Sequence, residues 1–248
     1  MSQIIVPGEQ VAQGVQRLAY TYTDGQNTYA TVMCLRSQDD KIIPLAGPYE
    51  PVESDTVVGF IVDTRHSGYD IAMGNSNRCF LSSRETRTSF KLSDIVVARI
   101  KSVDETGTID LTDARPLKDG HLLPISAVKV PRLIGKKNSM IGLISNATGC
   151  VIHVGRNGIV FVSNEGNFTL ANEAIQKVEN EAHIPGLTDR MTQFLSQKCG
   201  KDPLELSSAP YEPVENSYSN DFSAENSRFS RGPRRHSGFS RRPKDSRR

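Results

Sequence analysis

The feature that most constrains the fold is a series of five short β-rich runs between about residues 55 and 118, and three of the four connections between them contain glycine. Each run is too short for a typical helix and is rich in residues that favour strands. The runs are Val57–Val62, Tyr69–Met73, Arg78–Leu81, Ile95–Ile100 and Thr108–Leu111. Five such strands in about 65 residues predict a small closed β-barrel.

The residues before this barrel also have the pattern of short strands. Two β-rich runs, Ala30–Leu35 and Lys41–Leu45, are separated by the polar connection Arg36–Asp40. Proline cannot donate to a strand ladder, so Pro44 and Pro48 confine their segments to sheet edges or turns. We therefore expect a small β domain before the barrel.

After about residue 122 the pattern changes to mixed α and β. The motif Asn157-Gly158 lies between two β-branched runs, which is the strongest short-range signal for a hairpin. Ser139–Thr148 has a helical apolar face, and Thr188 is a candidate N-cap for a last helix. The other expected elements are a strand at Ile125–Val130 and a helix at about Thr169–Ala182.

The segment Val130–Ile141 contains a Gly-Lys-Lys-Asn loop between two helical stretches, as in a KH domain, whose GXXG loop clamps a nucleic-acid backbone. Gly135 permits close backbone approach, Lys136 and Lys137 attract phosphate, and the next helix presents free N–H groups. The alternative is a helix-turn-helix corner with solvated lysines. The turn residues Gly155, Asn157 and Gly158 are expected to support the fold more than the function.

Positive charge is concentrated at the far C-terminus. Residues 1–199 carry 20 Lys and Arg against 21 Asp and Glu, whereas Arg228–Arg248 carry nine cations and one acid. Cations interleaved with phenylalanines can follow a nucleic-acid backbone while the rings stack on bases. The candidate RNA contacts there are Arg234, Arg235, Arg241 and Arg242. The alternative is a solubilising tail. Too little apolar surface remains after Cys199 for a core, so we expect residues 202–248 to be disordered.

The sequence contains no recognisable catalytic or metal-binding motif. It has no P-loop, GxSxG or HExxH, the five histidines lack metal-ligand spacing, and the four cysteines form no CxxC pair. We therefore expect no enzymatic activity, metal or cofactor. No run approaches the roughly 18 apolar residues of a membrane span, and the N-terminus lacks the features of a signal peptide. A cytoplasmic protein without membrane contact is expected.

Several of these segments together resemble one family. Residues 129–162, with both the loop and the Gly-x-Asn-Gly turn, resemble the KH domain of RNA exosome cap subunits of the ribosomal-RNA-processing protein type, in their archaeal form. Val6–Glu9 and Ile43–Pro51 resemble that family's N-terminal domain, and Val57–Thr112 resembles its S1 domain. The resemblance covers about residues 4–199, in the family's domain order.

The resemblance implies a multidomain β and α+β protein. Its parts are an N-terminal β domain at residues 1–53, an OB-fold S1 barrel at 54–121, a type I KH domain at 122–201, and a basic tail at 202–248. It also implies a non-catalytic cap that binds single-stranded RNA. Three copies are expected on a hexameric ring of phosphorolytic subunits, docked through the N-terminal domain, with the barrel loops lining the entry pore.

Two departures from the family concern RNA contacts. Asn138 replaces the last glycine of the KH loop, although asparagine tolerates left-handed geometry. The family's aromatic and histidine positions on the S1 RNA face correspond here to Ser67, Asp70 and Leu81. Base stacking is therefore left to Tyr69 or Phe80, of which Phe80 is expected in the core. The residues of a possible cationic rim on the barrel are Arg65, His66, Arg78, Arg84 and Arg87. Their alternative is a scattered solvated surface. By electrostatics we rank the tail first, the barrel second and the KH loop third.

Other arrangements of S1 and KH domains fit the sequence less well. In polynucleotide phosphorylase the KH domain precedes S1 and catalytic domains come first. The transcription elongation factor with S1 then KH has two KH copies, and the second exosome cap type ends in a zinc ribbon, which the scattered cysteines exclude. An S1/KH transcription or translation factor acting outside the exosome remains the alternative.

Overall fold

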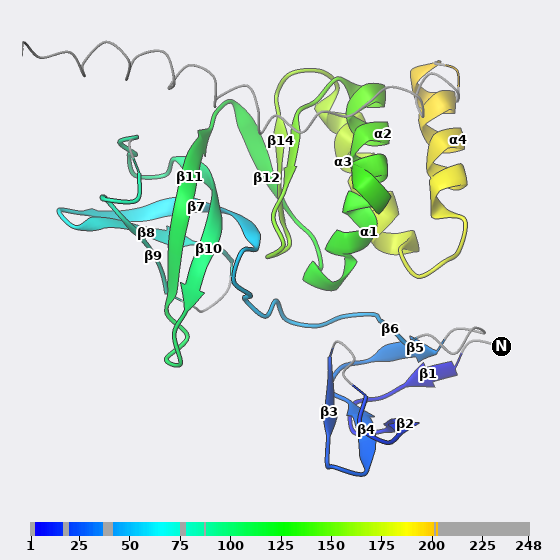
Figure 1. Ribbon diagram of the computed structural model, residues 1–248. Coiled ribbons are helices and arrows are strands. Elements are labelled where there is room, and N and C mark those ends of the chain that lie inside the picture. The colour runs from blue at the N-terminus through cyan, green and yellow to red at the C-terminus, as the bar shows by residue number, and fades with distance from the viewer. Residues whose placement is uncertain are drawn as a thin grey trace, which may run out of the picture. The chain divides into compact units, whose positions relative to one another are not determined.

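The structure is a computed structural model that describes residues 3–16, 20–36, 42–74, 78–86, 88–200 and 202. Along the chain it has a small N-terminal β domain, a closed β-barrel and an α+β domain (Figure 1). No helix in these described ranges is long and apolar enough to cross a membrane.

The N-terminal domain consists of two three-stranded antiparallel sheets. The first has the order β1 (Gln3–Ile5), β5 (Cys34–Arg36), β6 (Ile42–Pro44), and the second the order β2 (Gln10–Gln13), β4 (Asn27–Ala30), β3 (Thr21–Thr23). Their small core contains Ile5, Val11, Ala30 and Cys34. The expected single run Ala30–Leu35 is wrong, because β4 ends at Ala30 and β5 begins at Cys34 in the other sheet.

The five expected barrel strands are all present. They are β7 (Thr56–Arg65), β8 (Gly68–Ala72), β9 (Cys79–Ser82), β10 (Ile95–Val103) and β11 (Ile109–Leu117). The barrel closes in the order β10-β11-β9-β8-β7, with β9 and β11 parallel and the other pairs antiparallel. Alternate side chains fill its interior, among them Ile61, Leu81, Ile100, Ile109 and Leu111. The predicted OB-type barrel is confirmed.

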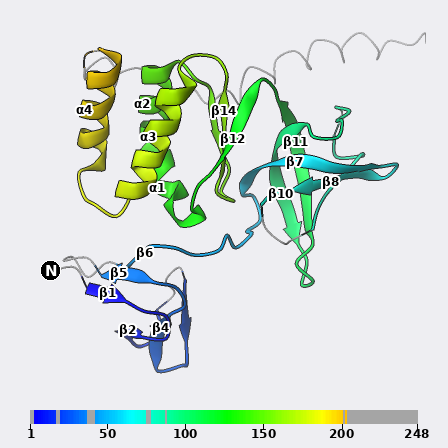
Figure 2. The same cartoon turned by 180° about the vertical axis from the view of Figure 1, so that it is seen from behind.

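The α+β domain has the strand and helix order of a type I KH domain. Its elements are β12 (Gly120–Pro124), η1 (Ala127–Lys129), α1 (Val130–Ile134), η2 (Lys136–Asn138), α2 (Ser139–Thr148), β13 (Ile152–Val154), β14 (Ile159–Ser163), α3 (Phe168–Glu181) and α4 (Leu187–Cys199). The strands form an antiparallel sheet in the order β12-β14-β13. The four α-helices lie on one face of this sheet in both ribbon views (Figures 1 and 2).

Two details of this domain differ from the sequence prediction. Ile125–Val130 is not a strand: the strand ends at Pro124, and α1 begins at Val130 with Pro131 in its first turn, where proline is well tolerated. Thr188 is not the N-cap of α4. The N-cap is Gly186, two residues before the expected position, and its left-handed backbone (φ 72°) turns the chain into the helix.

Candidate nucleic-acid interface

The Gly-Lys-Lys-Asn loop forms a tight turn between α1 and α2. Gly135 has φ 72°, and a Cβ at this position would lie 2.7 Å from the backbone nitrogen of Met140, so only glycine fits. Lys137 (φ 53°) and Asn138 (φ 61°) are both left-handed. Asn138 thus has the backbone geometry expected of it, and the turn is complete without a second glycine.

The loop places two cations at the N-terminus of α2. The side chains of Lys136 and Lys137 are exposed, and no ion pair involves either among the described residues. The N-cap of α2, Asn138, makes no side-chain hydrogen bond to the first turn of the helix. Unsatisfied N–H groups and the helix dipole favour an anion at this end. The loop can therefore hold a phosphate group.

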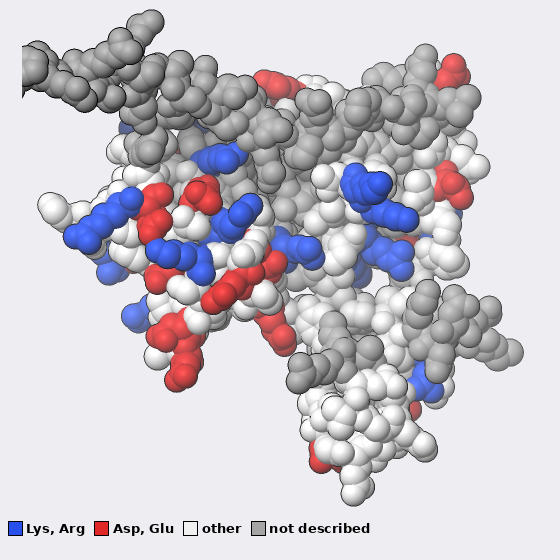
Figure 3. Space-filling model, in the orientation of Figure 1, with Lys and Arg blue, Asp and Glu red and all other residues white. Residues whose placement is uncertain are grey.

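The cationic surface extends beyond the loop. The sequence contains no Asp or Glu from Gly120 to Asn164, but it contains five Lys and Arg: Lys129, Arg132, Lys136, Lys137 and Arg156. Figure 3 shows Lys and Arg gathered over α1 and the start of α2, whereas both signs are interspersed over the barrel. Sequence reasoning missed Lys129 and Arg132. The absence of acids across this segment was the signal that could have identified them.

On the barrel, the first predicted contact is already occupied by acids. The guanidinium of Arg65, at the end of β7, pairs with Asp63 at 3.2 Å and also with Asp70. The carboxylate of Asp70 faces outward on β8 beside Phe80 of β9. An RNA phosphate would have to compete with both carboxylates for Arg65.

The remaining barrel candidates do not all lie together. Ser83 donates its N–H to the carbonyl of Ser67 at 3.0 Å, so the β7–β8 turn and the end of β9 are adjacent. This contact brings Arg65, His66 and Arg84 to one end of the barrel. Arg78 precedes β9 and therefore lies at the opposite end. Arg87, like the tail residues Arg234, Arg235, Arg241 and Arg242, lies outside the described residues.

Leu81 and Phe80 of β9 lie on the opposite sides of the barrel wall from those predicted from the sequence. Leu81 is 0% exposed and belongs to the core, so it cannot lie on an RNA face. Phe80 is half-buried on the outer side, where a Cβ on Gly68 would lie 2.7 Å from its ring. The ring of Tyr69 packs edge-to-face on buried Phe90 at 5.3 Å, and its hydroxyl accepts the N–H of Phe90 at 3.4 Å. Phe80 is the better placed of the two for stacking, because period-two alternation turns it outward.

The turn between β13 and β14 binds the barrel rather than solvent. Asn157 accepts the N–H of Val58 at 3.1 Å through Oδ1. Its Nδ2 donates to the carbonyls of Val58 at 2.7 Å and Met73 at 3.0 Å. The N–H of Arg156 donates to the carbonyl of Thr56 at 2.8 Å. These bonds join the KH sheet to the strands of the barrel.

The close fit of this turn depends on its glycines. A Cβ on Gly155 would lie 2.7 Å from the nitrogen of Val58, and one on Gly158 would lie 2.4 Å from the carbonyl oxygen of Ile125. Gly158 also has φ 81°, which disfavours other residues. The sequence indicated the turn but gave no signal for its partner.

Comparison with known proteins agrees with this geometry. The family model described as KH domain matches residues 121–181. The exosome complex component Rrp4 of Thermococcus kodakarensis is 39% identical in an alignment 217 positions long, and the match covers 78% of this chain and 84% of that protein. The exosome complex component Rrp4 of Pyrococcus furiosus is 34% identical in an alignment 220 positions long, which covers 79% of this chain and 83% of that protein.

A solved structure agrees in fold as well. A crystal structure described as a candidate exosome complex RNA-binding protein matches with a TM-score of 0.54 and 26% identity, over 61% of this chain and 97% of that one. The chain therefore belongs to the family of exosome complex component Rrp4.

Proposed function

We propose that this chain is a non-catalytic, RNA-binding cap component of the exosome. It recruits single-stranded RNA and guides the 3′ end into a phosphorolytic ring for 3′-to-5′ degradation and processing. The observation that carries the RNA-binding part is the unpaired cationic surface around Lys136 and Lys137, at the N-terminus of α2, which has no side-chain cap. Family membership supports the exosome part and favours it over a transcription or translation factor.

The partners follow from the same proposal. Residues 1–53 dock on ring subunits, and three copies form a cap on a hexameric ring in the cytoplasm. The N-terminal domain suits docking on protein better than binding RNA. Its described residues expose apolar side chains, among them Ile4, Val6 and Tyr22, and contain Arg36 as their one Lys or Arg. Deleting residues 1–53 should abolish co-purification with ring subunits, and unchanged co-purification would contradict this assignment.

The RNA-binding part is tested by replacing both loop lysines. Lys136→Ser with Lys137→Ser should weaken binding of a single-stranded RNA about tenfold, since two exposed ion pairs contribute about 0.7 kcal/mol each. The slope of log affinity against log salt should fall by about 1.4, because each lost phosphate contact on a single strand removes about 0.7.

A matched control distinguishes binding at the KH loop from a general effect of net positive charge. Lys91→Ser with Lys118→Ser removes two exposed barrel lysines that form no ion pair within the described ranges. This control should change affinity much less than the loop variant does. Equal losses in the two double variants would show that the protein binds RNA through net charge alone, and would contradict the loop assignment.

A further inference from the structure

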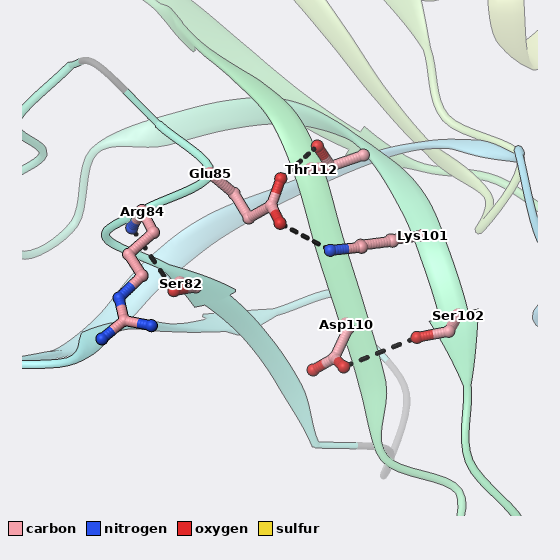
Figure 4. Close-up of polar contacts among 7 residues, drawn as sticks. All are labelled: Ser82, Arg84, Glu85, Lys101, Ser102, Asp110 and Thr112. Atoms are coloured by element: carbon pink, nitrogen blue, oxygen red, sulfur yellow. Dashed lines mark hydrogen bonds and ion pairs between the residues drawn. The ribbon is translucent and has the colours of Figure 1, made fainter.

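The connection between β9 and β10 is fixed to the barrel at two points. Near its start, Glu85 accepts a hydrogen bond from Lys101 Nζ of β10 at 2.5 Å and one from Thr112 Oγ1 of β11 at 3.2 Å (Figure 4). Near its end, Phe90 is buried in the barrel core and packs on Tyr69. Among the described residues between these anchors, Thr86, Thr88 and Ser89, none belongs to a strand.

The first anchor also determines where Arg84 lies. The N–H of Glu85 donates to the carbonyl of Ser82 at 3.0 Å, and the N–H of Arg84 donates to Ser82 Oγ at 3.3 Å. In Figure 4 the guanidinium of Arg84 points away from the Glu85 cluster. Arg84 is exposed and forms no ion pair with any residue that the structure describes.

Stability alone accounts poorly for this contact. The hydrogen bond with Lys101 lowers the pKa of Glu85 and raises that of Lys101, so both groups are charged at neutral pH. The two side chains are about one-third and one-half exposed, and ion pairs in such positions contribute little to folding. An acid at this place also opposes RNA binding and withdraws Lys101 from it. If Glu85 positions a neighbouring RNA contact, that role compensates for the repulsion of RNA and for the loss of Lys101 as a contact.

We infer that Glu85 is a positioning residue for RNA, which holds the start of the β9–β10 connection against β10 and β11 so that Arg84 is presented to the phosphate backbone. This inference rests on the proposed RNA-binding function. It assigns one free barrel cation, Arg84, as the contact, in place of Arg65, which Asp63 and Asp70 already neutralise.

The inference makes a prediction of opposite sign to simple electrostatics. Removing a negative charge from an RNA-binding surface normally strengthens binding. If Glu85 positions Arg84, its removal must weaken binding instead. Glu85→Gln preserves the size of the side chain and can still accept the hydrogen bond from Thr112, so it removes the ion pair with little other change.

The test is a double-mutant cycle in the full chain, measured with a fluorescent single-stranded RNA. Arg84→Ala should weaken binding about fivefold and Glu85→Gln about threefold, as expected for single charged contacts at an exposed site. The double variant should bind about as well as Arg84→Ala alone, because Glu85 has no arginine left to position once Arg84 is replaced. Glu105→Gln is the matched control, since it removes an exposed acid of the β10–β11 turn and should leave affinity unchanged or slightly raised.

Three outcomes would overturn the inference. Glu85→Gln could bind RNA as tightly as Glu105→Gln, the effects of the two substitutions could multiply in the double variant, or Arg84→Ala could leave affinity unchanged. In each case, a loss on replacing Lys136 and Lys137 would leave the proposed function standing. If the full chain binds no single-stranded RNA, both proposals fail. Faster amide exchange near Glu85 in Glu85→Gln, with the β10 amides unchanged, would confirm release of the connection in a folded barrel.

Discussion

The barrel and the KH domain contain equal numbers of cations but arrange them differently. Residues 54–121 have nine Lys and Arg against ten Asp and Glu, and residues 122–201 have nine against five. In the barrel, acids pair with Arg65 and Lys101, close to the expected RNA face. In the KH domain, the ion pairs are at α3 and α4, where Glu181 pairs with Lys177 and Arg190, and Glu173 with Lys198.

This difference suggests that the barrel and the KH domain contribute differently to RNA binding. Cations without partners can exchange counterions for RNA phosphates, whereas paired cations must first give up a carboxylate. We therefore expect the reverse of the ranking drawn from the sequence, with the KH loop making the stronger contact to RNA and the barrel the weaker one.

The largest expected effect is on the stability of the contact between the barrel and the KH domain. Asn157→Ala removes three hydrogen bonds to backbone groups of Val58 and Met73, both of which are buried. At about 1 kcal/mol each, the loss should destabilise the protein by about 3 kcal/mol, measured by urea unfolding. Asn164→Ala, at an exposed position, is the control. A loss below about 1 kcal/mol would mean that the two domains are held together by other contacts.

The next effect concerns the basic tail, whose own RNA binding could hide a difference between the barrel and the KH domain. Truncation after Lys201 should lower the slope of log affinity against log salt by roughly three, if half of the nine tail cations each neutralise a phosphate. The titration is done on the free protein with single-stranded RNA. If the truncated protein keeps its affinity and its slope, the tail is a solubilising extension, and the folded domains account for all of the binding.

A smaller effect addresses the paired cations of the barrel directly. Asp70→Asn releases Arg65 from one of its two carboxylates and should strengthen RNA binding about threefold, which corresponds to about 0.7 kcal/mol. Asp113→Asn removes an exposed acid of β11 and is the control for a general charge effect. Equal gains in both variants would show that the pairing of Arg65 does not limit RNA binding.

The smallest effect concerns the ion pairs of the KH domain. Hydrogen bonds from Lys177 and Arg190 lower the pKa of Glu181 in the folded state. A depressed carboxyl pKa adds stability at neutral pH that is lost as the pH falls through the folded value, below the ordinary 4.5. Glu181→Gln should therefore cost less than about 1 kcal/mol at pH 7, and this difference should shrink as the pH falls below the ordinary carboxyl pKa of 4.5.

RNA affinity provides the second measurement for that variant. Because Glu181 is on α3, away from the Gly-Lys-Lys-Asn loop in sequence and contacts, Glu181→Gln should leave RNA binding unchanged. Glu165→Gln, at an exposed position, is the control for stability. A change in RNA affinity with Glu181→Gln would place α3 and α4 within the binding surface and weaken the division between the two regions.

The sequence predicted those features that depend on local pattern. The β-rich runs indicated the five barrel strands, and the Asn157-Gly158 turn indicated the KH hairpin, because alternation and turn chemistry act over a few residues. Leu81 and Phe80 were assigned to the wrong sides because a shift of one residue in a strand exchanges its faces. The β9–β10 connection has no periodicity, so nothing in the sequence signalled the contact of Glu85 with Lys101.

The hydrogen bonds of Asn157 have a consequence for how the family can change over time. All three partner atoms are on the main chain, and every residue other than proline would supply them at positions 58 and 73. Substitutions on the barrel side can therefore accumulate without loosening the joint, provided that they still fill the core. The KH turn cannot vary in the same way. The amide side chain of Asn157 makes all three hydrogen bonds, and Gly155 and Gly158 leave no room for a Cβ. The joint thus places its evolutionary constraint on a four-residue turn and leaves the barrel free to adapt to new RNA substrates.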